Sequence, residues 1–340
     1  MSVLHMELGK NSYDITVERG ALQRANELLK LDRRVLIVTD EGVPEEYSEG
    51  IVSFCREPVK VVLPRGEKNK CMETYMGLLK VMTEHGFDRN DCVVAVGGGV
   101  MGDLAGFVAS SYMRGVDFYN VPTTLLSQID SSIGGKVAVD FEGYKNIIGA
   151  FYQPKAVLID PNVLSTLDSR QLACGMAEAV KMFASFNAQM FRKSEEIGEK
   201  DIDEIIIEAL KIKKSVVEQD EKESGLRKAL NFGHTVGHAI ESIEEKSDYP
   251  LLHGECVGIG MLCMSSPEIA RRLRHILHRA DLPTSWRGSE AELKEAMLHD
   301  KKAADGKISV ILVDEIGSFK TEKLTVDEII ERSREVLELI

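Results

Sequence analysis

The sequence has no apolar run long enough to cross a membrane, since none reaches the roughly 18 residues that a spanning helix needs. Its first residues show neither the basic nor the apolar stretch of a secretory signal. An excess of positive charge is also missing, because 55 acidic residues outnumber 42 basic ones and give the 340 residues a formal net charge of −13 at pH 7. That balance argues against general binding to nucleic acid or to a membrane surface. We therefore expect a cytoplasmic globular protein.

Cysteine and metalloprotease motifs are missing as well. Six cysteines are scattered along the chain, and none has the C-x-x-C spacing of redox or zinc-binding motifs. We expect them to be reduced thiols that mostly pack as small apolar groups. The sequence also lacks H-E-x-x-H, which excludes the standard metalloprotease helix.

The chain contains two styles of hydrophobic pattern. Up to about residue 165, short apolar runs alternate with helical stretches, and this alternation predicts parallel strands joined by crossover helices. Beyond residue 166 the pattern is helical, except for a strand in a small hairpin, and Pro267 is expected to kink or break one helix. Strands are expected at 34–39, 59–63, 92–96, 156–159 and 307–313, and the segment 2–17 is expected to pair at a sheet edge. Helices are expected at 71–85, 169–186, 187–197, 201–221, 225–245, 254–278, 289–299 and about 325–338.

A glycine-rich loop follows one of the buried strands. Gly97, Gly99 and Gly102 satisfy G-x-G-x-x-G, and an apolar helix begins at about Asp103. Glycine there lets the backbone approach a pyrophosphate, and the free N–H groups at the helix start can bind it. Asp40, at the end of an earlier strand, suits a ribose hydroxyl, although it precedes the glycine loop instead of following it. The alternative is a tight strand-to-helix turn without a ligand.

A dense polar segment comes next, at residues 121–136 and 145–151. Its polar side chains stand between apolar residues, so a simply solvated loop does not explain it. If the ligand is an anion, Lys136, Lys145 and the upstream Arg114 are local positive contacts for it. The polar residues of the segment include Gln128, Asp130, Ser131, Ser132, Lys136, Lys145 and Asn146.

The most informative pattern begins at Gly225. Polar residues follow one another at steps of four, three, four and three, which places all of them on one face of a single helix. Gly233 and Gly237 lie inside that helix, where each costs about 1 kcal/mol against alanine, so something is expected to approach its backbone closely. Such a face looks like the wall of a site for a metal or an anion. Its residues are Arg227, Asn231, His234, His238 and Glu241.

Further candidate metal ligands lie outside this segment. Glu178 and Lys181 are three positions apart in a predicted helix and face the same way, and His253 precedes an apolar helix. One carboxylate and two imidazoles suit a divalent ion such as zinc, with open positions for a substrate. The spacing does not decide whether His234 or His238 supplies the second imidazole. A structural role for each histidine is the alternative.

Seven motifs, taken together and in order along the whole chain, resemble the 3-dehydroquinate synthase family. They are G-G-G-V-M-G-D from Gly97, P-T-T-L-L-S-Q-I-D-S-S-I-G-G-K from Pro122, K-N-I-I-G-A-F from Lys145, M-A-E-A-V-K from Met176, G-L-R-K-A-L-N-F-G-H-T-V-G-H-A-I-E from Gly225, L-H-G-E from Leu252 and D-K-K from Asp300.

The resemblance implies two domains in a homodimeric protein. An α/β NAD-binding domain is expected at residues 1–165 and a mostly helical domain that binds metal and substrate at 166–340, with the active site in the cleft between them. Zinc, with cobalt as an alternative ion, is expected on Glu178, His234 and His253, which leaves His238 as a catalytic or phosphate-contacting group.

The resemblance also implies residues that contact NAD and the substrate. NAD contacts are expected at Asp40, Arg65, Gly66, Glu67, Lys68, Asn69, Lys70, Gly98, Gly99, Val100, Met101, Gly102, Asp103, Thr123, Thr124, Asp130, Ser131, Lys136, Lys145, Asn146, Val163, Leu164, Ser165 and Thr166. Substrate-binding and catalytic residues are expected at Arg114, Asp130, Lys136, Asn146, Lys181, Lys213, Glu223, Arg227, Asn231, His238 and the pair Lys301 and Lys302.

The implied reaction belongs to the shikimate pathway and converts 3-deoxy-D-arabino-heptulosonate 7-phosphate to 3-dehydroquinate and phosphate. The metal lowers the pKa of the C5 hydroxyl, and NAD accepts a hydride from C5. Phosphate then leaves by elimination, the hydride returns, the ring opens, and an intramolecular aldol step closes the carbocycle. NAD is recycled, so the net reaction is a lyase-type cyclisation in which positioning of a flexible intermediate matters.

Three other functions remain open. The chain could be a related sugar-phosphate cyclase that makes an inosose or a valiolone. It could be a metal- and NAD-dependent polyol dehydrogenase, but such an enzyme has no need for Arg114, Lys181, Lys213 and Arg227 to neutralise a carboxylate and a phosphate. It could also be a non-catalytic nucleotide-binding regulator, which would leave the metal ligands without a purpose.

Overall fold

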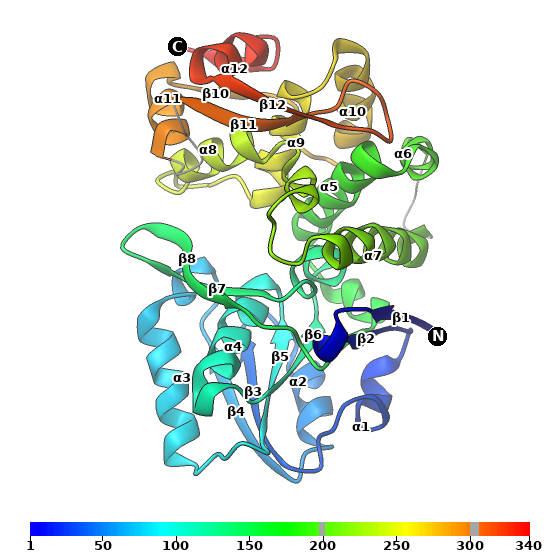
Figure 1. Ribbon diagram of the computed structural model, residues 1–340, viewed down its shortest axis with the longest axis vertical. Coiled ribbons are helices and arrows are strands. Elements are labelled where there is room, and N and C mark those ends of the chain that lie inside the picture. Colours follow the sequence, from blue (N-terminus) through cyan, green and yellow to red (C-terminus); the bar gives the residue numbers. More distant parts are fainter. Residues whose placement is uncertain (197–200, 300–305) are drawn as a thin grey trace. The chain divides into compact units, whose positions relative to one another are not determined.

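The computed structural model describes residues 1–196, 201–299 and 306–340, and these form two compact units. Unit 1 consists of residues 1–167 together with 213–218, and unit 2 consists of 168–212 and 219–340. Each unit has its own layered arrangement of helices and strands (Figure 1). Throughout the described ranges, no helix has both the length and the apolar character that crossing a bilayer requires.

Unit 1 is built on a seven-stranded sheet with the order β1-β2-β9-β6-β5-β3-β4. The pair β1 and β2 is antiparallel and forms one edge, and the remaining neighbours are parallel. The predicted buried strands are thereby confirmed, as is the prediction that the segment 2–17 pairs at an edge of the sheet. The strands are β1 (Ser2–Met6), β2 (Tyr13–Val17), β3 (Arg34–Asp40), β4 (Glu57–Leu63), β5 (Cys92–Gly97), β6 (Asp117–Pro122) and β9 (Ala156–Ile159).

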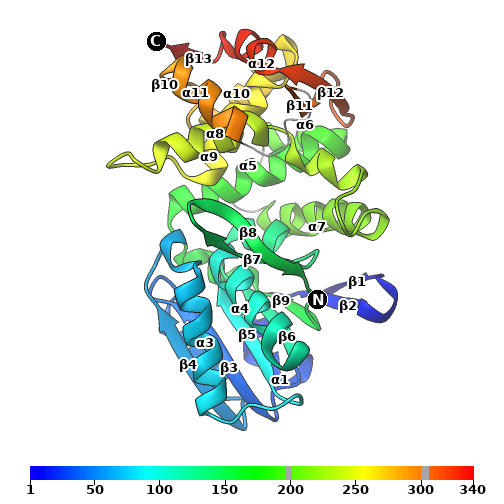
Figure 2. The ribbon, with the colours of Figure 1, turned by 60° about the vertical axis from the view of Figure 1, so that its left-hand side comes forward.

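Helices cover both faces of this sheet, as the continuous apolar runs require. On β3, Leu36 and Val38 pack in a core with α3 and α4, whereas Val35 and Ile37 pack on the opposite face with α1 and α2. Figures 1 and 2 show α3 and α4 together on one side of the sheet. The helices are α1 (Ala25–Leu28), α2 (Glu45–Val52), α3 (Met72–Glu84) and α4 (Gly99–Ser111).

Two features of unit 1 do not follow the sequence pattern. Strand β6 was not predicted, because the buried Asn120 interrupts its apolar run; the Asn120 amide donates to the Ser132 carbonyl at 2.9 Å. The polar segment after it is not a loop throughout, since β7 (Lys136–Phe141) and β8 (Tyr144–Phe151) form an antiparallel hairpin. Most residues of β8 are exposed, Ile147 and Phe151 among them, so this strand lacks the buried apolar run of the strands in the large sheet.

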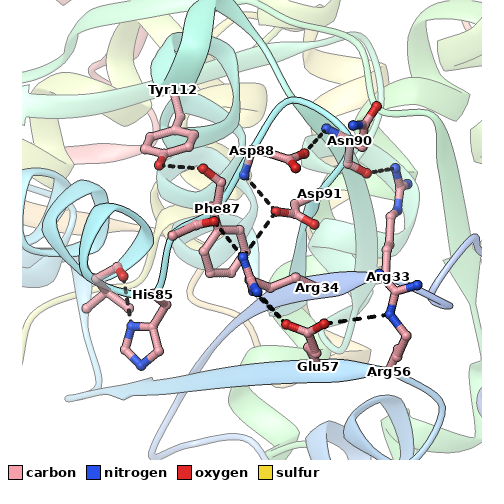
Figure 3. Close-up of polar contacts among 12 residues, drawn as sticks. Arg33, Arg34, Arg56, Glu57, His85, Phe87, Asp88, Asn90, Asp91 and Tyr112 are labelled. Carbon is pink, nitrogen blue, oxygen red and sulfur yellow. Dashed lines mark hydrogen bonds and ion pairs between the residues drawn. The ribbon is translucent and has the colours of Figure 1, made fainter.

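The amino-terminal edge of the parallel sheet is held by ion pairs and hydrogen bonds (Figure 3). Arg34 at the start of β3 pairs with Glu57 at the start of β4 at 2.5 Å and donates to the Gly86 carbonyl. Arg33 donates to the Asn90 carbonyl and pairs with Asp117 of β6, each at 2.8 Å. These contacts join the start of β3 to the starts of β4 and β6 at the edge opposite the glycine loop, so we assign them to stability.

Unit 2 is mostly helical, as predicted. Helix α9 is its centre, because every residue from Gly254 to Cys263 is buried and α5, α8 and α10 all pack against it. Figure 2 shows α8 and α9 lying next to each other. The helices are α5 (Ser169–Phe186), α6 (Ala188–Ser194), α7 (Ile202–Gln219), α8 (His234–Glu244), α9 (His253–Cys263), α10 (Pro267–Arg279), α11 (Glu290–His299) and α12 (Val326–Ser333).

Unit 2 also contains two small sheets. The predicted late hairpin is confirmed, since β11 (Lys307–Leu312) pairs antiparallel with β12 (Lys320–Thr325). The helix expected at 325–338 is shorter than predicted, because α12 ends at Ser333 and β13 (Leu337–Leu339) pairs with β10 (Trp286–Gly288). The single helix expected at 254–278 is two helices, with Pro267 at the first turn of α10.

The single helix expected at 225–245 is also wrong. Residues Leu226–Asn231 form a short 3-10 helix, η8, and α8 begins only at His234. Gly233 separates the two with a φ of +79°, a left-handed conformation that glycine adopts without strain. Arg227 and Asn231 therefore do not share a helix face with the two histidines.

The glycines predicted that something approaches the backbone closely. In the structure, helix α9 makes this close approach to α8. A Cβ on Gly260 of α9 would lie 1.9 Å from the Gly233 carbonyl oxygen, and one on Gly237 would lie 3.0 Å from the Cys256 carbonyl oxygen. Glycine at these three positions therefore lets the backbones of α8 and α9 approach each other. That contact fixes the spacing between the first residues of the two helices, His234 and His253.

Candidate metal centre and nucleotide-binding edge

Unit 2 brings a carboxylate and three imidazoles together. Glu178 comes from the middle of α5, His234 from the start of α8, His238 one turn later, and His253 from the start of α9. The Nε2 atoms of His253 and His234 lie 3.5 and 4.0 Å from Glu178 Oε1. One ring nitrogen from each of the three histidines lies within 4.8 Å of the others. The cluster has the donor types and the size of a divalent metal site.

The second nitrogen of each of two histidines is anchored to an acceptor. His253 Nδ1 lies 3.0 Å from Glu241 Oε2, and His234 Nδ1 lies 3.2 Å from the Phe232 carbonyl. Each acceptor favours a proton on Nδ1 and a lone pair on Nε2. Metal-ligating histidines are commonly oriented in this way. Both Nε2 atoms are those nearest Glu178 Oε1.

The charges around Glu178 favour its ionised form. Burial raises the pKa of this carboxyl, but the Lys181 ammonium and the imidazoles of His253 and His234 outweigh burial and hold it well below its ordinary value. Burial and Lys181 lower the pKa of His234. Burial would also lower the pKa of His253, but Glu178 and Glu241 raise it to about 10. The neutral ring of His234 and the anion of Glu178 are the forms that bind a cation.

The donor set fits a divalent cation. Glu178 is 1% exposed, Lys181 donates to its Oε2, and Oε1 accepts no hydrogen bond from the described residues. A buried carboxylate oxygen without a hydrogen bond is costly, and a cation between it and the two Nε2 atoms would compensate that cost. His238 is exposed at the side of the cluster. Glu178 with His234 and His253, and the three histidines together, are both sets of donors close enough to hold one ion, so the ligand set implied by the resemblance stays a prediction.

Three more predicted residues of unit 2 lie on one ordered turn. Asp220 accepts hydrogen bonds from the backbone N–H groups of Ser224, Gly225 and Arg227 at 2.7–2.9 Å. Those N–H groups, that of Arg227 first, lower the Asp220 pKa. The same turn carries Glu223, which accepts from the Asn231 amide at 2.8 Å.

The side chain of Arg227 is buried although it is charged. Its Nη1 donates to the Glu221 carbonyl at 2.5 Å, and η8, which carries it, packs against α5. Asp220, whose role the sequence did not indicate, thus fixes the backbone that carries Glu223 and Arg227.

In unit 1, the predicted NAD contacts gather at the carboxyl edge of the sheet. Asp40 ends β3 and Gly97 ends β5, and these strands are neighbours although β4 comes between them in the chain. A Cβ on Gly97 would lie 3.7 Å from Asp40 Oδ2. Strand order therefore explains why the acid precedes the glycine loop in sequence. The chain reverses its direction of winding here, which is where open α/β sheets bind ligands.

The glycine loop leads into the thirteen residues of α4, whose first turn has no acidic side chain. Cβ atoms on Gly98 and Gly99 would lie 3.1 Å from Thr124 Cγ2 and 3.0 Å from Ser131 Oγ. The Ser131 hydroxyl is buried and has no hydrogen-bond partner in the described chain. A helix start with free N–H groups, approachable backbone and an unused hydroxyl fits a pyrophosphate. The predicted Val100, Met101 and Gly102 lie in the same first turn.

The other predicted NAD contacts follow neighbouring strands. Thr123 comes directly after β6, and its N–H donates to the Gly97 carbonyl at 2.9 Å. Asp40 accepts from the Gly42 N–H at 2.7 Å, and burial raises the Asp40 pKa. A Cβ on Gly42 would lie 2.2 Å from Arg65 Nε, so the Arg65 guanidinium lies beside Asp40. The group Val163, Leu164, Ser165 and Thr166 belongs to the 3-10 helix η6 (Pro161–Thr166) after β9.

A buried lysine links the loop after β4 to α4 and to the hairpin. Lys70 is 4% exposed and lies 2.5 Å from Glu67, 3.4 Å from Asp103 and 4.0 Å from Asp140. Burial raises the pKa of Asp103 to about 7, although Lys70 pulls it down. The predicted loop residues Gly66, Glu67, Lys68 and Asn69 lie at or within the 3-10 helix η3 (Glu67–Asn69).

The predicted substrate contacts of unit 1 are divided among two short helices, the β7–β8 hairpin and α7. Asp130, in the π-helix η5 (Ser127–Ser131), pairs with Lys213 at 2.5 Å. Lys136, Lys145 and Asn146 lie on the β7–β8 hairpin, where Asn146 has a φ of +54° and donates its N–H to Asp140. Arg114 is exposed in the 3-10 helix η4 (Tyr112–Arg114), with a φ of +67°. The predicted Lys301 and Lys302 lie outside the described residues.

The fold and the two groups of side chains define the class of this protein. One unit contains a parallel sheet of the nucleotide-binding type, and the other is helical and carries a cluster of glutamate and histidine side chains that fits a metal ion. Two family models match the sequence: 3-dehydroquinate synthase N-terminal over residues 60–174 and 3-dehydroquinate synthase C-terminal over 175–303. The chain therefore belongs to the 3-dehydroquinate synthase family.

Full-length relatives agree with the family models. A 3-dehydroquinate synthase of Enterococcus faecalis is 41% identical over 96% of this chain and 97% of its own length. One of Clostridium acetobutylicum is 39% identical over 96% of this chain and 98% of its own.

Solved structures share the fold. A 2-epi-5-epi-valiolone synthase from Streptomyces hygroscopicus, with NAD⁺ and Zn²⁺ bound, superposes with a TM-score of 0.86 at 27% identity and covers 99% of this chain and 98% of its own. A 2-deoxy-scyllo-inosose synthase has a TM-score of 0.88 at 24% identity over 99% of this chain and all of its own. A probable glycerol dehydrogenase from Sinorhizobium meliloti shares the fold less closely, with a TM-score of 0.63 at 18% identity over 95% of each chain.

Proposed function

We propose that this protein converts 3-deoxy-D-arabino-heptulosonate 7-phosphate to 3-dehydroquinate and phosphate, with NAD and a divalent metal as cofactors. The observation that carries the proposal is the buried Glu178 oxygen opposite two imidazole nitrogens, in a chain about 40% identical to enzymes named for this product. The net reaction eliminates phosphate and is of the lyase type. Zn²⁺ and NAD⁺ in the valiolone synthase, 27% identical to this chain, support the choice of cofactors.

The metal would be held in unit 2 by Glu178, His234 and His253. When bound, the cation supplies Lewis acidity that makes a substrate hydroxyl a better proton donor. Lys181, which donates to the other oxygen of Glu178, keeps that carboxylate ionised and adds positive charge beside the cluster. To His238, which is exposed one helical turn after His234, we assign the role of holding or moving a proton of the substrate.

The dinucleotide would be held in unit 1 at the carboxyl edge of the sheet. When bound, NAD supplies a reversible hydride acceptor, so no net NADH accumulates. The N–H groups at the start of α4 would bind the pyrophosphate, Ser131 would add a hydroxyl, and Asp40 would accept a hydrogen bond from a ribose. The cleft between the domains, expected from the resemblance, stays a prediction.

The substrate carries a carboxylate and a phosphate, and the chain offers separate cations for them. Lys181 and the buried Arg227 belong to unit 2, and Lys136, Lys213 and the exposed Arg114 belong to unit 1. A buried guanidinium such as Arg227 suits a phosphate or carboxylate, because its planar donors match their oxygens. We assign these cations to substrate anions, together with Asp130, Asn146, Glu223 and Asn231 as polar contacts.

Two further statements belong to the proposal. A cytoplasmic location is supported by six cysteines that are all free thiols, four of them buried. A homodimer is proposed from the family resemblance, and light scattering after gel filtration measures it directly.

One assay tests the reaction and separates it from its alternatives. Purified protein is mixed with the heptulosonate phosphate, catalytic NAD and Zn²⁺, while released phosphate and absorbance at the NADH band are followed together. We expect phosphate and dehydroquinate in equal amounts without net NADH. Phosphate release from sugar phosphates that lack the carboxylate, and not from the heptulosonate, would indicate another cyclase. NADH in proportion to a simple polyol, without phosphate, would indicate a dehydrogenase.

A further inference from the structure

We propose that Glu241 is a positioning residue of the metal centre, which orients His253 and strengthens it as a ligand. This inference rests on the metal site of the proposed function. Glu241 was part of the polar pattern in the sequence but received no role there. In the structure its Oε2 lies 3.0 Å from His253 Nδ1, the nitrogen that does not face Glu178.

The backbone of His253 is fixed independently of Glu241. A Cβ on the next residue, Gly254, would lie 2.4 Å from the Cys174 backbone of α5, so the start of α9 lies directly on that helix. Glu255 accepts from the Leu252 N–H at 2.7 Å and pairs with Arg170 through both carboxylate oxygens. Arg170 also donates to the Pro250 carbonyl at 2.8 Å. These contacts place the Cα of His253 but leave its ring free to rotate about its side-chain bonds.

Glu241 removes that remaining freedom. With Nδ1 held against Glu241, Nε2 is directed toward Glu178 Oε1, 3.5 Å away. The acceptor is an anion that is only 17% exposed, so its charge acts on the ring with little screening by water. A carboxylate behind an imidazole also raises the basicity of the nitrogen that binds the metal.

The second histidine is oriented differently. His234 Nδ1 faces the Phe232 carbonyl, a backbone group that no side-chain substitution removes. A substitution of Glu241 therefore tests how a metal-binding histidine is oriented, and it leaves that histidine itself unchanged. Its own position follows from α8, on which it lies seven residues after His234, and from the close contact of α8 with α9.

The test measures metal binding as well as turnover. Full-length protein is stripped of metal, and its Zn²⁺ affinity is measured by competition with a coloured chelator. The absorption of the Co²⁺ form reports the geometry of the ligands. We expect Glu241→Ala to weaken Zn²⁺ binding about 10- to 100-fold, the range for such outer partners, and to change the Co²⁺ spectrum. Glu241→Gln keeps an oxygen acceptor, so it should lose less affinity and recover the wild-type spectrum more closely.

Two comparisons make the result decisive. Glu268→Gln removes a similar charge from the exposed start of α10, away from the cluster's own helices, and should leave Zn²⁺ affinity unchanged. Melting of the metal-free variants shows whether the fold is intact, and Glu241→Gln serves if Glu241→Ala does not fold. Wild-type affinity in both Glu241 variants would overturn this inference and leave the metal centre standing. Wild-type protein that binds no Zn²⁺ would overturn the proposed metal centre, and this inference with it.

Discussion

Replacing Gly260 by alanine should damage both stability and metal binding, because this residue sets the distance between α8 and α9. The new Cβ would lie 1.9 Å from the Gly233 carbonyl oxygen and 2.9 Å from the Gly237 nitrogen, whereas ordinary contacts begin at 3.4 Å. Both neighbours are backbone atoms, so no side chain can rotate away. The helices must separate locally by about 1.5 Å to accommodate the methyl group.

The expected loss of stability follows from two opposing terms. Overpacking a well-packed interior costs about 1–3 kcal/mol, and a collision with backbone belongs at the upper end. Replacing glycine by alanine inside a helix returns about 1 kcal/mol. We therefore expect a net loss of about 2 kcal/mol, seen as a lower urea midpoint in far-ultraviolet circular dichroism.

The effect on the metal should be larger than the effect on stability. His234 follows Gly233 directly, and His253 begins the helix that contains Gly260. Metal–ligand distances tolerate only about 0.2 Å, so a shift of the size calculated would separate the two imidazoles from a common ion. Zn²⁺ affinity should fall by more than in Glu241→Ala.

A matched control is available in unit 1. Gly77 lies inside α3, is exposed, and a Cβ there would meet no heavy atom of the described residues within 4 Å. Gly77→Ala should raise stability by about 0.5–1 kcal/mol and leave Zn²⁺ binding unchanged. If Gly260→Ala is as stable as wild type and binds Zn²⁺ equally well, the assignment of helix spacing to these glycines is wrong.

Three further outcomes are expected. Glu178→Ala should lose bound metal and activity while NADH still binds, as fluorescence titration would show; unchanged metal content would contradict the ligand assignment. Asp40→Ala should weaken NAD binding and leave Zn²⁺ affinity intact, and the reverse pattern would place the dinucleotide elsewhere. Asp220 has its pKa lowered in the folded state, so its contribution is present above its ordinary value of 3.8 and is lost as pH falls below it. Asp220→Asn should therefore lower the urea midpoint at pH 7 and show less additional loss on acidification; parallel curves for wild type and variant would contradict this.

Much of unit 1 could be predicted because its strands are short and apolar on both faces. Residues 34–39 and 92–96 are such strands, and β3 and β5 form there, joined through crossover helices. Strand β6 was not predicted, because the buried side-chain amide of Asn120 replaces an apolar residue in its run. The β7–β8 hairpin was not predicted, because most residues of β8 are exposed and the strand shows no alternation of apolar and polar residues.

The break at Gly233 could not be predicted from the local sequence. Residues 227, 231, 234, 238 and 241 have the spacing of one helix face, and that spacing is the same whether or not the chain turns between them. A contact with Gly260, twenty-seven positions away, decides the conformation. The glycines did signal a close approach, but only the structure identifies what approaches. For the same reason, Glu241 and Asp220 received no role from the sequence.

The metal cluster is built so that its geometry depends on backbone contacts more than on side-chain packing. Glu178, His234 and His253 lie on three helices, and the contacts that fix those helices involve Gly233 with Gly260 and Gly254 with the Cys174 backbone. Backbone atoms in contact cannot repack, so the spacing of the ligands has little freedom. A cluster placed on loops would tolerate more substitutions nearby but would hold an ion less accurately. Substitutions at these glycines should therefore abolish metal binding more often than substitutions in the apolar core around them, where neighbouring side chains can adjust.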